Sequence, residues 1–187
     1  MSYTRLLARA VIGGLFIGHG TQKLFGWFGG PGPQGTEQMM DKLEMEPRRA
    51  QALAAGMTET VSGSLLALGL ATPAAAAGLT GVMLTAIRKV HFRNGPWNTN
   101  GGYEYNLVLI AALLTLADGG PGELSLDRAL GIDRTGPEWA LAALIAGAAG
   151  SAIAIEFGRR RAAREQAATG PGQEEQRKQR ERAGQPA

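Results

Sequence analysis

The 187-residue sequence contains no cysteine. This absence excludes disulfides, thiolate nucleophiles, cysteine-ligated zinc and iron–sulfur clusters. The sequence also lacks a phosphate-binding loop, because the stretch GGPGPQG at residues 29–35 is not followed by Gly-Lys-Ser/Thr. It contains no nucleophile elbow. The sequence therefore lacks the motifs of P-loop nucleotide-binding proteins and of hydrolases that use a nucleophile elbow.

Charged residues are scarce in most of the chain and crowded at its C-terminal end. The net charge is +3 and the mean hydropathy is −0.07, but these values average an apolar body rich in Ala, Gly and Leu with a very polar tail. The stretches GRRRAAR and EEQRKQRER place much of the Lys and Arg after residue 158. We expect residues 159–187 to form a basic, disordered tail, because they lack the apolar residues of a core. Interleaved Glu and Gln favour a solvated tail with no nucleic-acid partner.

Five apolar segments predict five helices, at about residues 6–28, 50–70, 73–92, 103–118 and 138–157. A bilayer core of about 30 Å needs roughly 20 residues of helix, and four of the segments reach that length. They are apolar around most of their circumference, unlike the surface helices of soluble proteins. Aromatic residues lie near the segment ends, as in an interfacial belt: Trp27, Trp97, Tyr103 and Trp139. We therefore predict an all-α transmembrane helical bundle.

Small residues recur at four-residue spacing in two of these segments. Gly14 and Gly18 form one such pair, and Ala143, Gly147 and Ser151 form a longer series. This spacing allows helix backbones to approach closely in lipid.

Two connections carry helix signals of their own. The stretch TEQMMDKLEMEPRR, residues 36–49, predicts a short amphipathic helix at the surface. Ser125 is expected to cap a short helix that ends near Gly131.

Basic residues predict the orientation in the membrane. A cytoplasmic cluster at residues 159–164, combined with five spans, places the N-terminus outside and the tail in the cytoplasm. The other basic residues then on the cytoplasmic side are Lys42, Arg48, Arg49, Arg88, Lys89 and Arg93. Those left outside are Arg5, Arg9, Arg128 and Arg134, of which the first two favour the opposite orientation.

Polar side chains within four of the segments are predicted to share one side of the membrane. Segments that alternate in direction bring the end of the first beside the beginning of the second, and the end of the third beside the beginning of the fourth. The opposite halves of the second, third and fourth segments are nearly bare of charge. The predicted intramembrane polar cluster consists of His19, Gln22, Lys23, Glu59, Arg88, His91, Glu104 and Asn106.

This cluster has two interpretations. Its role could be purely structural, because polar residues that contact one another stabilise membrane helix bundles by about 1 kcal/mol each. Lys23, Arg88 and Lys89 could also extend to the interface. Glu59 and His19 are too deep for that, so they carry the functional interpretation as a ligand or proton site. A metal site among His19, Glu59, His91 and Glu104 has suitable ligand types but no ligand-spacing motif, and we predict none.

The sequence resembles the DoxX family of small membrane proteins. The resemblance lies in HGTQKLFG (19–26), TETVSGSLLALGL (58–70), AIRKVHFRNG (86–95), GGYEYNLVL (101–109) and GPGELSLD (120–127). It implies a four-helix membrane domain at residues 1–134. The additional transmembrane helix predicted at residues 135–158 and the tail at 159–187 are not explained by the family pattern.

The resemblance implies a role for the chain as a membrane subunit in the bacterial cytoplasmic membrane. The family takes its name from a subunit of a thiosulfate:quinone oxidoreductase, and other members are linked to oxidative-stress complexes. A redox or detoxification role would need a quinone or redox-protein partners, because the chain has no cysteine. The alternatives are a permeation protein for small molecules or lipids, and a scaffold that recruits partner proteins. Whether the chain is catalytic, and in what oligomeric state it works, is left open by the sequence.

Overall fold

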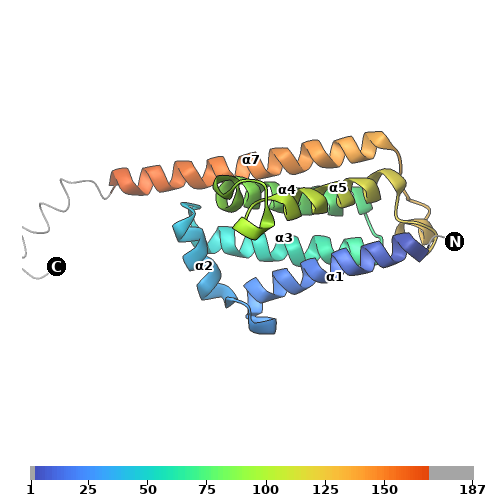
Figure 1. The fold of residues 1–187 in the computed structure, drawn as a ribbon, viewed down its shortest axis with the longest axis horizontal. Coiled ribbons are helices and arrows are strands. Elements are labelled where there is room, and N and C mark those ends of the chain that lie inside the picture. The colour runs from blue at the N-terminus through green and yellow to red at the C-terminus, as the bar shows by residue number, and fades with distance from the viewer. Residues whose placement is uncertain (1–2, 169–187) are drawn as a thin grey trace, which may run out of the picture.

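The computed structural model describes residues 3–168, which form an all-α bundle without strands (Figure 1). The helices within these residues are α1 (Tyr3–Phe25), α2 (Gly32–Lys42), α3 (Arg48–Leu68), α4 (Thr72–Ala86), α5 (Glu104–Gly119), α6 (Leu126–Ala129) and α7 (Pro137–Ala168). Short turns follow α1 at Trp27–Gly29, and follow α4 as a π turn at Ile87–His91 and two 3-10 turns at Phe92–Asn94 and Asn98–Asn100. Each of the five predicted helices is present.

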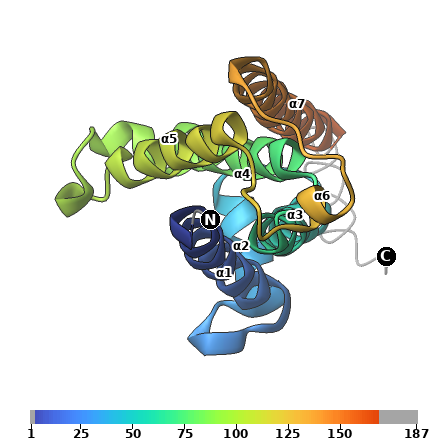
Figure 2. The ribbon, with the colours of Figure 1, turned by 90° about the vertical axis from the view of Figure 1, so that its right-hand side faces the viewer.

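The five long helices pack in a fixed order. α1 lies along α3, while α4 lies at the centre in contact with α3, α5 and α7. Figure 2 shows the same order along the bundle axis, with α7 on the outside against α4 and α5. α2 crosses one end of the bundle and contacts α1 and α3. Ser125 caps the start of the short α6, as predicted, because its hydroxyl accepts a hydrogen bond from the Arg128 N–H.

The last helix is longer than expected. α7 continues to Ala168, so residues 159–168 are helical where the composition predicted a disordered tail. Glu156 pairs with Arg159 at 2.8 Å and with Arg160 at 2.6 Å, the spacings that stabilise a helix. The prediction relied on missing apolar residues, which report on tertiary burial, whereas Ala, Arg, Glu and Gln all have high helix propensity. The remainder of the expected tail, 169–187, lies outside the described residues.

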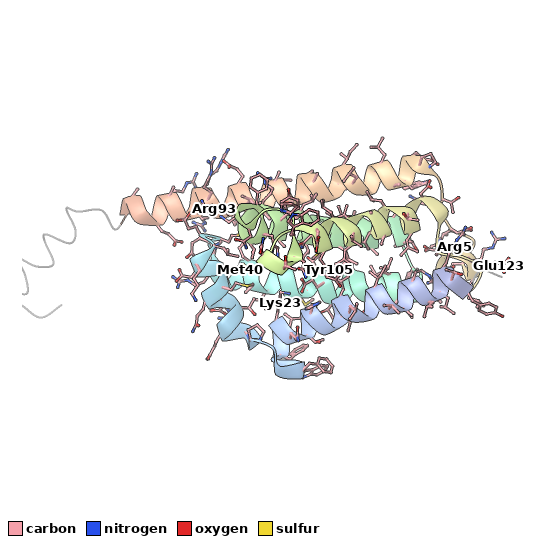
Figure 3. The ribbon with its side chains drawn as sticks, in the orientation of Figure 1. Arg5, Lys23, Met40, Arg93, Tyr105 and Glu123 are labelled. Atoms are coloured by element: carbon pink, nitrogen blue, oxygen red, sulfur yellow. The ribbon has the colours of Figure 1, made fainter. Side chains whose placement is uncertain are left out.

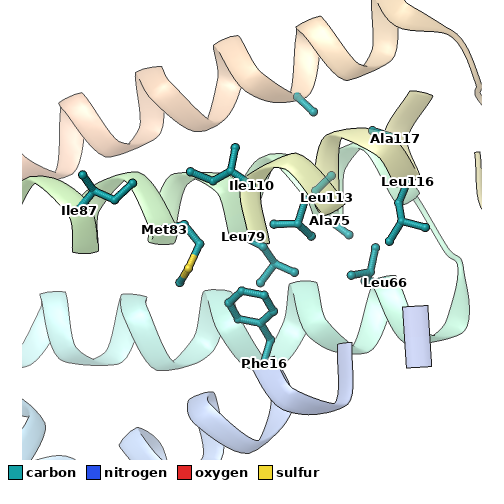
Figure 4. Packing of buried hydrophobic residues seen from close by; sticks show 12 residues of the cluster. Phe16, Leu66, Ala75, Leu79, Met83, Ile87, Ile110, Leu113, Leu116 and Ala117 are labelled. Carbon is teal, nitrogen blue, oxygen red and sulfur yellow. The ribbon is translucent and has the colours of Figure 1, made fainter. Parts of the chain in front are cut away.

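The apolar core joins α1, α3, α4 and α5. Phe16 of α1 points into the bundle toward Leu79 and Met83 of α4, beside Leu66 of α3 (Figure 4). Leu113 of α5 completes this layer and is fully buried. The core therefore fixes the relative positions of the helices that also line the site described below.

Close approach of α1 and α3 depends on glycine. A Cβ atom at Gly13 would lie 2.5 Å from the Gly63 carbonyl oxygen, and one at Gly63 would lie 2.8 Å from the Gly13 oxygen. The predicted contact residues Gly14 and Gly18 are wrong, because a Cβ atom at either would meet nothing within 4 Å. Each residue turns the helix direction by about 100°, so neighbouring glycines face different surroundings.

The second small-residue prediction is confirmed at the contact between α4 and α7. Ala143, Gly147 and Ser151 are all buried there. A Cβ atom at Gly147 would lie 2.8 Å from the Ala77 carbonyl oxygen, and the Thr85 hydroxyl lies 2.9 Å from that of Ser151. The small side chains therefore let the two backbones approach closely, as the spacing indicated.

We expect Gly13→Ala to lower the free energy of unfolding by about 1–3 kcal/mol, because the added methyl group overpacks the α1–α3 contact. The matched control is Gly14→Ala, where alanine has free space and a higher helix propensity, so stability should be unchanged or rise by up to about 1 kcal/mol. Thermal unfolding in detergent checks this opposite sign. Equal effects of the two substitutions would contradict the helix packing.

A buried charged group also lies at the end of the bundle away from α2. Arg9 is fully buried, and its guanidinium donates hydrogen bonds to the Leu124 carbonyl at 2.6 Å and the Ala67 carbonyl at 3.3 Å. Asp127, which is 2% exposed, accepts hydrogen bonds from the backbone N–H groups of Ala71 and Thr72. Arg9 therefore binds the segment around α6 to the bundle. The side of the membrane on which it lies stays a prediction.

Among helices of the described residues, α7 alone meets a length-and-composition criterion for crossing a membrane, over Pro137–Glu165. Only 17% of its most apolar window is buried within the bundle. α4 and α5 are shorter, at 15 and 16 residues, while α1 and α3 carry several charged residues. Insertion of all five long helices therefore stays a prediction.

Candidate functional site

An ion pair between α1 and α3 forms the centre of the site. The Lys23 Nζ lies 2.5 Å from the Glu59 Oε2. The Lys23 side chain is 18% exposed and the Glu59 side chain 4%. The two helices approach closely enough for this contact because glycine occupies position 20 of α1, where a Cβ atom would lie 2.7 Å from the Gly56 carbonyl oxygen. The pair therefore joins two charges that are largely shielded from water, as expected for charged groups in such surroundings.

His19 lies one helical turn before Lys23 on the same face of α1. Its Nδ1 is 3.2 Å from the Gln22 Oε1, so the amide holds the ring through a hydrogen bond. The imidazole is exposed in the isolated chain, although its residue borders the cavity described next. Gln22 therefore acts on the site through His19 and does not border the cavity itself.

A cavity of about 610 Å³ opens beside the ion pair. Its wall is mostly apolar and is formed by residues of α1, α2, α3, α4, α5 and α7. In Figure 3, the labelled Lys23, Met40 and Tyr105 lie in one half of the molecule, away from Arg5 and Glu123 at the other end. Five residues of the predicted polar cluster line the cavity: His19, Lys23, Glu59, His91 and Asn106. The structure thus brings these five residues from four chain segments to one cavity.

Hydrogen bonds fix two of these polar residues in place. The His91 Nδ1 lies 2.7 Å from the Gly101 carbonyl oxygen, which ties the end of the π turn to the next loop. The buried Asn106 amide donates to the Met83 sulfur at 3.4 Å. Because a thioether is a weak acceptor, the Asn106 amide can exchange that contact for a better acceptor.

Three predicted cluster residues do not line this cavity: Gln22, Arg88 and Glu104. Arg88 lies on the π turn and borders a separate, smaller pocket. Glu104 is the first residue of α5, where its backbone N–H donates to the Pro96 carbonyl at 2.8 Å. The fourth predicted helix therefore contributes Tyr105 and Asn106 to the cavity, one and two residues further along.

Sequence reasoning missed the contribution of α2 and the residues after it. Met39, Met40, Leu43 and Met45 all border the cavity, and Met40 and Met45 are buried. The amphipathic pattern of 36–49 did predict the helix, but at the surface. Its methionines were the available signal, since flexible thioether side chains often line adaptable binding surfaces.

The described residues contain no group of three or more His, Asp or Glu side chains positioned to hold a metal ion. Glu59 is paired with Lys23, and His91 is held by a backbone carbonyl. The site is therefore an ion pair with nearby imidazole and amide groups, facing an apolar cavity.

The fold and this cavity define the described chain as an all-α bundle with a ligand-sized cavity. Residues 4–92 match the DoxX family model, and that family consists of helical membrane proteins. The match spans α1 to the π turn after α4, and includes His19, Lys23, Glu59 and His91. The resemblance at 101–127 lies beyond the matched range. Comparisons with curated proteins and with solved structures gave no match.

Proposed function

We propose that this protein binds a quinone in the cavity beside Lys23 and Glu59, and serves as a membrane subunit of a redox or detoxification system. The single observation that carries the proposal is the combination of a deep ion pair with an apolar cavity of about 610 Å³. Cavities of about 300–1,000 Å³ hold ligands of drug size, and a few placed polar groups orient them.

The residues of the cavity fit a quinone headgroup. A quinone is a flat apolar ring with carbonyl acceptors at opposite edges. The Lys23 ammonium and the Asn106 amide can donate to such carbonyls, while the methionines and Phe16 face the ring and its tail. The carboxylate of Glu59 holds Lys23 in position for this contact.

Bound quinone would supply reversible electron transfer, which consumes protons and electrons in equal number on reduction. Glu59 and His19 are groups that can give up or accept protons next to the cavity. The electrons would come from a redox-protein partner, because the chain has no thiol to supply them. Because the electrons would come from another protein, we propose a subunit rather than a complete enzyme.

We also propose that the chain crosses the bacterial cytoplasmic membrane several times with its C-terminal end in the cytoplasm. Large apolar side chains are exposed on helices other than α7, which favours lipid contact around the bundle. Examples are Leu7, Val11 and Leu15 on α1, and Val61 on α3. The basic residues around α2 and the end of α7 favour a cytoplasmic location for that end.

The test uses the full chain in neutral-lipid nanodiscs, titrated calorimetrically with a short-chain benzoquinone. We expect saturable binding that Glu59→Gln weakens by about tenfold or more, because the loss of a charged hydrogen-bond partner releases Lys23 from its position. Glu104→Gln is the matched control, since Glu104 does not line the cavity, and it should bind as the wild type does. No saturable binding, or equal weakening by both variants, would refute the proposal.

A further inference from the structure

A second pocket lies next to the main cavity, between the end of α2 and the π turn that follows α4. Its volume is about 260 Å³. Four cationic side chains border it, together with one carboxylate: Lys42, Arg88, Lys89, Arg93 and Glu44. Arg93 lies in the same half of the molecule as Lys23 and Met40 in Figure 3. The pocket thus concentrates positive charge at the end of the bundle that α2 crosses.

These cations have no carboxylate partner among residues 3–168. In the described residues no ion pair within 4 Å involves Lys42, Arg88, Lys89 or Arg93. Elsewhere arginines do find acids: Arg48 pairs with Asp41 and Glu46, and Arg160 with Glu156. The positive charge of the pocket therefore remains available to an anion from outside the chain.

The local backbone explains why the cations converge. α4 widens into a π turn at Ile87–His91, and such turns are frequent at functional sites. Arg88 lies on the π turn, and Arg93 lies on the 3-10 turn at Phe92–Asn94 that directly follows it. Lys42 approaches from the end of α2, so cations from two separate elements share the pocket.

We propose that this pocket binds a phosphate group. Arginine guanidinium matches phosphate oxygens through paired N–H donors, and lysine adds a point charge. Basic pockets at membrane proteins bind anionic lipid headgroups by this chemistry. The walls also include Leu43, Val90 and Phe92, which provide apolar contact for the carbon atoms attached to a phosphate.

This site adjoins the quinone site, and the phosphate proposal stands if the quinone proposal fails. The two pockets share Leu43, Lys89 and Val90 along their walls. The phosphate could belong to a lipid headgroup or to a soluble molecule. The shared chemistry is the phosphate anion, and the two arms of the experiment separate its sources.

In the first arm, native mass spectrometry of the full chain compares added phosphatidylglycerol with added phosphatidylcholine. In the second arm, glycerol 3-phosphate is titrated calorimetrically into the full chain in phosphatidylcholine nanodiscs. Preferential binding of phosphatidylglycerol identifies a lipid headgroup, and saturable binding of glycerol 3-phosphate identifies a soluble ligand. If neither phosphatidylglycerol nor glycerol 3-phosphate binds, the proposal is overturned.

The decisive variant is Arg88→Gln combined with Arg93→Gln, and the matched control is Arg49→Gln. Arg49 is exposed near the same end of the bundle but does not border the pocket. We expect the double variant to bind about tenfold or more weakly, since each basic residue near a membrane surface contributes about fivefold. Arg49→Gln should bind like the wild type, and Arg88→Lys with Arg93→Lys should retain part of the binding. Equal loss in the control, or none in the double variant, would overturn the assignment.

Discussion

Glu59→Gln and Lys23→Met should each destabilise the bundle, and the two together should cost less than the sum of the single effects. Glu59→Gln leaves the Lys23 ammonium without its counter-charge in a site where the side chain is 18% exposed. Lys23→Met leaves the carboxylate of Glu59 nearly buried and unpaired. The double variant removes both charges, so we expect a coupling energy of about 2 kcal/mol.

Unfolding of the purified protein by denaturing detergent, followed by circular dichroism, measures the stability of the wild type, the two single variants and the double variant. His19→Ala provides a comparison within the same face of α1, because His19 contacts Gln22 and is exposed. Its effect should stay within about 0.5 kcal/mol, as for most exposed side chains. Additive effects at Lys23 and Glu59 would show that the two charges do not interact in the folded state.

Asp127→Ala should have the largest effect on stability at the opposite end of the bundle, about 3 kcal/mol. The Asp127 carboxylate accepts hydrogen bonds from the Ala71 N–H at 2.7 Å, and from the Thr72 N–H and hydroxyl at 3.0 Å each. These contacts satisfy the first N–H groups of α4, and alanine would leave them unpaired in a buried place. The positive charge of Arg9 would also lose its favourable electrostatic interaction with the Asp127 carboxylate.

Asp133→Ala is the matched control for Asp127. Asp133 pairs with Arg128 at 3.2 Å, but the two side chains are 29% and 62% exposed. A surface pair of this kind contributes about 0–1 kcal/mol. Hydrogen exchange should show new exposure at residues 69–72 in Asp127→Ala alone. Equal melting temperatures for the two variants would contradict the structural role given to Asp127.

The long helices could be predicted because each is a local feature of the sequence. Apolar runs and the residues that end them depend on neighbours along the chain, so the five predicted segments correspond to α1, α3, α4, α5 and α7. The choice between Gly13 and Gly14 was not predictable in this way, since it depends on how α1 is rotated against α3. The burial of Arg9 depends on the carbonyls of Leu124 and Ala67, which are distant in sequence.

The part of the site that depends only on helix direction could also be predicted from the sequence. Alternating helix direction was enough to bring Lys23 and Glu59 to one end, and no detail of packing was needed. Arg88 and Glu104 illustrate the limit, because a π turn and a helix start determine which residue faces the cavity. The contribution of Met40 and Met45 depends on α2 folding back over α1 and α3, which no local pattern specifies.

The most direct test of the account is to locate the bound ligand. A benzoquinone carrying an azide on its ring would be photolysed with the full chain in nanodiscs, and labelled peptides would be sequenced by mass spectrometry. We predict labelling within residues 15–23 of α1 and 54–59 of α3, removed by excess unlabelled quinone. Labelling confined to the exposed face of α7 around Leu141 and Ile145, or labelling that excess quinone does not reduce, would contradict a quinone site in the cavity.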